Sequence, residues 1–122
     1  MTRTMLIAWL WLLLMPLTSA VHAARPPDAT TGNDLLRACS ARGYGPDFWF
    51  CQGYLAGLHQ TIVSMTNLGA LKPPYCPPVG FTNRQLRNVV LGYLWAYPAE
   101  LEQPAEYLAL AALSTAYPCA KQ

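Results

Sequence analysis

The sequence has little of the side-chain chemistry that catalysis requires. Residues 24–122 contain one histidine, His59, and no Gly-rich phosphate loop, no H-E-x-x-H motif and no G-x-S-x-G motif. An enzyme needs a positioned acid, base, nucleophile or metal. We interpret His59 as a solvated surface imidazole, since it falls off the apolar face of the helix expected around it. The sequence therefore predicts a protein that is not an enzyme and carries no cofactor.

Clustered charge is also scarce along the chain. Eight basic residues stand against six acidic ones, for a formal net charge of +2. Nucleic acids and anionic membranes both require clustered positive charge, so neither is a predicted partner. The acids Glu100, Glu102 and Glu106 do gather near the start of the last expected helix. Carboxylates at that position suit the helix dipole, which explains them without catalysis.

No apolar run is long enough to predict a membrane span. Met5 to Leu14 is an unbroken apolar stretch that follows Arg3 and stops before Pro16, whereas a span needs about 20 residues. Val21 and Ala23 are residues that signal peptidase accepts at the −3 and −1 positions of its cleavage site. We predict an exported protein with a signal peptide over residues 1–23. Cleavage after Ala20 is the second choice, and an uncleaved anchor is the alternative. Residues 24–32 are expected to form a mobile, Pro-rich lead.

All four cysteines lie beyond the predicted cleavage site, at Cys39, Cys51, Cys76 and Cys119. An even number of cysteines in a small exported chain indicates disulfides. The alternative is a zinc site that includes His59, but the spacings contain no C-x-x-C pair. We therefore predict two disulfides and no metal, in a single domain over residues 33–119.

Local signals predict an all-α fold, a small four-helix domain. Thr31 with Asp34 and Thr82 with Gln85 have the spacing of capping boxes. Pro46 suits the first position of a helix. The expected helices cover residues 33–41, 46–67, 83–97 and 104–117. The predicted inward faces consist of Phe48, Cys51, Leu55, Leu58, Ile62 and Met65 in the second helix, Leu86, Val90, Tyr93 and Tyr97 in the third, and Tyr107, Leu110, Leu113 and Tyr117 in the fourth.

The order of these helices also predicts how the cysteines pair. Cys39 closes the first helix and Cys51 opens the second, so a tight turn brings them together. Cys76 precedes the third helix and Cys119 follows the fourth, so a hairpin of those helices makes them neighbours. We predict Cys39–Cys51 and Cys76–Cys119 over the other two pairings.

Two surfaces are candidates for binding another protein. The first is the loop from Lys72 to Pro78, which four prolines stiffen and Cys76 ties down. A stiff loop loses little entropy on binding, and Tyr75 at its centre is a candidate anchor. The alternative is that Tyr75 folds back into the core.

The second candidate surface is the outer face of the third helix. Leu91 and Trp95 lie four residues apart and away from the predicted inward stripe, with Gly92 between them. The functional interpretation is a contact between two copies of the chain. The alternative is that the first or fourth helix covers this face.

Five segments together resemble a known family. In chain order they read LLRAC, CQGYLAG, YCPP, TNRQLRNVVLGYLWAYP and ALSTAYPC, and they extend from Leu35 to Cys119. This pattern resembles the Rap/Tai-type immunity proteins of bacterial type VI secretion. The resemblance implies a helical, disulfide-bonded, often dimeric periplasmic protein that binds and blocks a peptidoglycan amidase injected by neighbouring cells. It carries over the four cysteines but no inhibitory residue. We interpret Cys51, Gly53, Tyr54 and Gly57 as helix-packing positions.

Two other functions remain open at this point. One is a small periplasmic chaperone that resembles the HdeA-type acid-stress proteins. The chain has only six acidic residues, so protonation in acid would change its net charge little, which counts against this function. The other is an envelope structural or assembly factor without a toxin partner.

Overall fold

The computed structural model describes residues 30–120, and the predicted signal peptide and residues 24–29 lie outside this range. Its helices are α2 (Gly32–Ser40), α3 (Pro46–Asn67), α4 (Asn83–Ala96) and α5 (Ala105–Ala116), with a short 3₁₀ turn, η2 (Pro98–Glu100), before α5. No strand occurs in the described range; Thr31 and Pro104 form an isolated bridge. The predicted all-α fold is confirmed.

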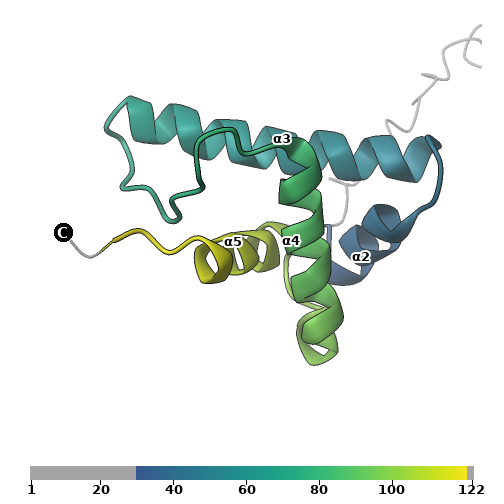
Figure 1. Ribbon diagram of the computed structural model, residues 1–122. Coiled ribbons are helices and arrows are strands. Elements are labelled where there is room, and N and C mark those ends of the chain that lie inside the picture. Colours follow the sequence, from purple (N-terminus) through teal and green to yellow (C-terminus); the bar gives the residue numbers. More distant parts are fainter. Residues whose placement is uncertain (1–29, 121–122) are drawn as a thin grey trace, which may run out of the picture.

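The helices are arranged around α4, which contacts each of the other three. The long α3 runs along the top of the view in Figure 1, and α4 descends from it. Helix α2 also packs against α3 and α5, which closes the core on that side. The segment between α3 and α4 turns back from the far end of α3 toward the C-terminal tail (Figure 1).

Both predicted capping boxes are formed. The Thr31 side chain accepts a hydrogen bond from the Asp34 amide, and Asp34 Oδ2 accepts one from the Thr31 amide at 3.1 Å. Thr82 and Gln85 make the same reciprocal pair, with Thr82 N donating to Gln85 Oε1 at 2.8 Å. The bonds from Thr31 to its carboxylate lower the pKa of Asp34. Local sequence therefore fixes where α2 and α4 begin.

The core is built by the buried faces of all four helices, and it differs in part from the predicted faces. Met65, Tyr97 and Tyr107 are exposed, so their predicted inward positions were wrong. Leu94 takes the place expected for Tyr97. In α5 the buried face is rotated, because nearly every position of that helix is apolar and its sequence does not single out one stripe. The fully or largely buried side chains of α4 and α5 are Leu86, Val90, Leu94, Ala105, Leu108, Ala109, Ala112 and Leu113.

Both predicted disulfides are confirmed. Cys39 pairs with Cys51 inside the core, with their Cα atoms 5.1 Å apart. Cys76 pairs with Cys119 near the surface, with a Cα separation of 4.9 Å. A hydrogen bond of 2.8 Å from the Cys76 amide to the Tyr117 carbonyl lies beside the second disulfide. The staples therefore join α2 to α3, and the α3–α4 segment to the C-terminal tail.

The start of α2 packs tightly against the segment before α5. Gly32 N donates to the Gln103 carbonyl at 2.9 Å, and Ala105 N donates to Thr30 O at 2.8 Å. A Cβ atom on Gly32 would lie 2.9 Å from the Leu101 carbonyl oxygen, closer than real Cβ contacts allow. Glycine is therefore required at this position so that the two backbones can approach.

Candidate partner-binding surfaces

Tyr75, the predicted loop anchor, lies in the core and not on the surface. Its side chain is 4 % exposed, and its hydroxyl lies 2.7 Å from His59 Nδ1 on α3. Burial raises the pKa of the Tyr75 hydroxyl. The structure thus favours the second of the two interpretations of this residue. Within the loop, Lys72, Pro73, Cys76 and Pro78 are exposed, so these residues form its accessible surface.

His59 is half-buried, so its interpretation as a solvated surface imidazole was wrong. Its ring packs beside Tyr75 and meets the edge of Phe81, with ring centroids 5.9 and 5.5 Å apart. Burial lowers the pKa of the imidazole. The α3–α4 segment folds back over this part of α3, which a helical face pattern does not reveal. Within residues 30–120, Tyr75 is the hydrogen-bond partner of His59, and no carboxylate orients the ring.

Free thiols and candidate metal sites are absent from the described residues. All cysteines in residues 30–120 are in disulfides, and no group of three or more His, Cys, Asp or Glu side chains in that range is placed to hold a metal ion. None of the described helices is long and apolar enough to cross a membrane.

The three glutamates near α5 all have partners within the fold. Tyr93 donates to Glu100 at 3.3 Å, Asn33 Nδ2 donates to Glu102 at 2.6 Å, and Tyr54 donates to Glu106 at 3.0 Å. Burial, together with the Glu106 carboxylate, raises the pKa of Tyr54 to about 12. These carboxylates therefore tie the start of α5 to α2, α3 and α4.

The outer face of α4 is only partly covered. Leu91 is half-buried against the core, while Trp95 is 64 % exposed. A Cβ atom on Gly92 would meet nothing within 4 Å. Trp95 and Gly92 therefore form an open patch on α4.

Two glycines of α3 also face open space. A Cβ atom on Gly53 or on Gly57 would contact nothing within 4 Å. Their interpretation as helix-packing positions was therefore wrong for the folded chain by itself, while Cys51 and Tyr54 do pack, against α2 and α5 respectively.

The structure shows an aromatic cluster at the α2–α3 turn that was not predicted from the sequence. Tyr44 is 80 % exposed and Trp49 is 61 % exposed, and both rings contact Phe48. Phe50 is exposed on the same turn of α3 and stacks on Tyr54. The run YGPDFWF could have indicated this cluster, since it places four aromatic residues within seven positions at the start of a helix. We call Tyr44, Phe48 and Trp49 the aromatic rim.

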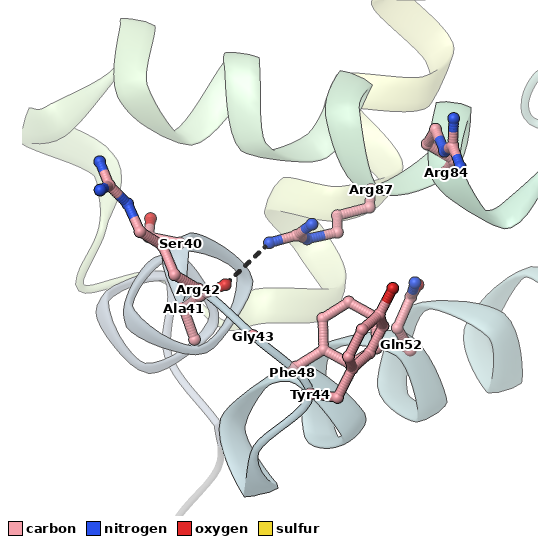
Figure 2. A pocket seen from close by; sticks show the side chains of 9 residues that line it. All are labelled: Ser40, Ala41, Arg42, Gly43, Tyr44, Phe48, Gln52, Arg84 and Arg87. Carbon is pink, nitrogen blue, oxygen red and sulfur yellow. Dashed lines mark hydrogen bonds between the residues drawn. The ribbon is translucent and has the colours of Figure 1, made fainter.

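A pocket of about 540 Å³ opens beside the aromatic rim (Figure 2). It lies between the α2–α3 turn, α3 and the first turns of α4, and three arginines from different parts of the chain line it: Arg42, Arg84 and Arg87. In the view of Figure 2, Arg87 lies between the other two. The bases are scattered along the sequence, but the fold brings these three to one place.

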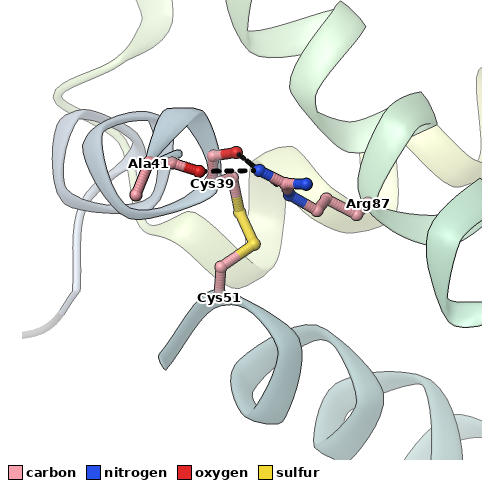
Figure 3. The surroundings of a disulfide bond; sticks show 4 residues. All are labelled: Cys39, Ala41, Cys51 and Arg87. Atoms are coloured by element: carbon pink, nitrogen blue, oxygen red, sulfur yellow. Dashed lines mark hydrogen bonds between the residues drawn. A yellow bond between two sulfur atoms is a disulfide. The ribbon is translucent and has the colours of Figure 1, made fainter. Parts of the chain in front are cut away.

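Arg87 is held in position by the end of α2 (Figure 3). Its Nε donates to the Cys39 carbonyl at 3.0 Å, and its Nη2 donates to Cys39 O and, at 3.3 Å, to Ala41 O. The guanidinium carbon lies 5.5 Å from the centroid of the Phe48 ring. A cation is favourable at the C-terminal end of a helix, where carbonyl groups lack helical partners.

Comparison with known proteins identifies the family. A family model described as Rap1a immunity proteins matches residues 31–119, which include all four helices and both disulfides. Comparisons with curated proteins and with solved structures give no match. The matched range covers most of the chain, in agreement with the resemblance noted in its sequence. The chain therefore belongs to the Rap1a immunity protein family.

Proposed function

We propose that this protein is an exported immunity protein that binds a peptidoglycan amidase effector in the periplasm and blocks its active site. The family match over residues 31–119 is the observation that carries the proposal. An immunity protein acts by binding, and family membership does not call for catalysis. The amidase target follows from the resemblance of the sequence to inhibitors of that enzyme class.

The physical character of the chain supports a binding role in an oxidising compartment. Two disulfides join segments that are 12 and 43 residues apart, which suits an exported domain. Prolines and the Cys76–Cys119 disulfide hold the 72–78 loop, so little ordering entropy is lost when this surface binds. Exposed Trp95 on α4 supports a contact between two copies of the chain, as the resemblance to an often dimeric family implies.

A protection experiment tests the proposed function. Cells that lack this gene should lose survival when neighbouring cells deliver the amidase, and the full chain should restore it. A chain without residues 1–23 should fail to protect, because it would stay in the cytoplasm with its cysteines reduced. Unchanged survival of the deletion strain against every amidase encoded beside the gene would favour a chaperone or envelope role instead.

A further inference from the structure

We propose that the arginine pocket receives an acidic segment of the effector protein, whose carboxylates lie against Arg42, Arg84 and Arg87. This inference rests on the proposed function, since it names the chemistry by which the partner is recognised. Arginine guanidinium groups bind carboxylates through paired, charge-assisted hydrogen bonds, which give both affinity and orientation.

The pocket concentrates positive charge that the fold does not neutralise. No acidic residue lines it within residues 30–120. The acids of this range lie elsewhere: Asp34 and Asp47 pair with Arg37, and Glu100, Glu102 and Glu106 accept hydrogen bonds around α5. Arg42 and Arg84 make no hydrogen bond or ion pair with any described residue. The described residues therefore separate their charges, and none of their acids opposes the cationic pocket.

The middle of the pocket is preorganised. Arg87 is fixed by the carbonyls of Cys39 and Ala41 and by the Phe48 ring, while its Nη1 group donates to no described residue. The Cys39–Cys51 disulfide anchors the carbonyl-bearing end of α2 (Figure 3). A donor held in place before binding loses little entropy when it engages a partner. Arg87 therefore offers Nη1 as a rigid donor, with exposed Arg42 and Arg84 as adaptable ones.

The surroundings of the pocket favour a protein over a nucleic acid. Tyr44 lines the pocket with the arginines, and the exposed Trp49 ring lies next to Tyr44. Tyrosine, tryptophan and arginine are the residues in which protein-binding hot spots are richest. A nucleic acid would require a basic track along its phosphates, and the described chain carries as many acids as bases. An acidic protein segment is thus the occupant that fits both the charge and the rim.

Purified effector binding tests the pocket directly. The amidase encoded beside the gene is titrated against wild type, the double variant Arg42→Gln/Arg84→Gln and the control Arg37→Gln, which removes one positive charge outside the pocket. The double variant should lower the association rate constant by about tenfold or more and flatten its dependence on salt. Arg37→Gln should bind as wild type does. Equal binding by wild type and the double variant would overturn the proposal while leaving the proposed function intact.

A second probe tests the pocket even if the amidase does not bind. A blocked alternating Gly-Glu peptide and its Gly-Gln counterpart are titrated while the arginine Nε–Hε resonances are followed by NMR. The acidic peptide should shift the signals of Arg84 and Arg87, and the neutral peptide should not. No shift with either peptide, or stronger shifts with inorganic phosphate or an RNA oligonucleotide than with the acidic peptide, would contradict the assignment. Failure of the amidase alone would instead count against the proposed function.

Discussion

Arg87 is the residue whose role is clearest from its contacts. It reaches from α4 to the carbonyls of Cys39 and Ala41 at the end of α2, next to the buried disulfide. Those carbonyls have no helical donors, so Arg87 supplies the bonds that the end of α2 lacks. The same side chain thus fastens two helices and forms the middle of the pocket.

Replacing Arg87 should therefore destabilise the fold. Arg87→Gln removes the guanidinium fork and leaves carbonyl groups without partners, which costs about 1–3 kcal/mol of unfolding free energy. Arg84→Gln is the matched control, one turn away, exposed and without hydrogen bonds to described residues, and should stay within about 0.5 kcal/mol of wild type. Urea denaturation of the three proteins measures both values. Equal midpoints for Arg87→Gln and wild type would show that the fork adds no stability.

His59 gives the stability a dependence on pH. A chain beginning at Ala24 has this single histidine, and burial lowers its folded-state pKa below the ordinary value of 6.5. Between that lowered value and 6.5 the unfolded state binds more protons than the folded state. The unfolding free energy contributed by the neutral His59 ring is therefore at its full value above pH 6.5. It falls as the pH drops through this window and stays constant below it.

His59→Gln should remove this component of the pH dependence. Urea unfolding of both proteins across the acid range gives the difference in stability at each pH. The unfolding free energy of wild type should fall relative to that of His59→Gln as the pH drops below 6.5, because only wild type has an imidazole at position 59 to protonate. Parallel profiles for the two proteins would mean that the burial of His59 is not linked to its titration.

At the scale of elements, local patterns predicted helix ends better than helix faces. The Thr31–Asp34 and Thr82–Gln85 boxes and Pro46 mark the starts of α2, α4 and α3, because capping involves residues three apart in sequence. Which face of a helix is buried depends on the segments that pack against it. Tyr75 and His59 meet because the α3–α4 segment returns over α3, and no local period contains that information.

The arginine pocket could not be predicted from the sequence for the same reason. Arg42, Arg84 and Arg87 belong to the α2–α3 turn and to α4, and their proximity arises only when α4 packs on α2. The cysteine pairing, in contrast, was predictable, since each partner lies at an end of an element and the order of elements decides which ends meet.

The two disulfides should contribute unequally to stability. In the loop-entropy model, removing the Cys76–Cys119 link costs about 4 kcal/mol and removing Cys39–Cys51 about 3 kcal/mol, because the first closes the longer loop. Either loss is large for a domain whose total stability is about 5–15 kcal/mol. Denaturation of the Cys76→Ala/Cys119→Ala and Cys39→Ala/Cys51→Ala pairs measures the effects. A wild-type midpoint in either pair would contradict this account.

For the whole molecule, the exposed part of α4 bears on self-association. Trp95 projects into solvent beside Gly92, and burying such a ring between two copies is favourable. Trp95→Ala should shift the protein toward the monomer in sedimentation velocity and leave the fold intact. Tyr107→Ala, which removes another exposed aromatic, serves as the control. If wild type is already monomeric at high concentration, this surface is not a contact between copies.

The central claim is that the chain binds and blocks a cell-wall amidase. The most direct measurement mixes the purified disulfide-bonded protein with the candidate amidase encoded beside its gene and follows peptidoglycan cleavage. The account predicts that activity falls in proportion to the immunity protein added until it is abolished, and that the two proteins elute together in gel filtration. Full cleavage with the immunity protein in excess, with the two proteins eluting separately, would contradict it.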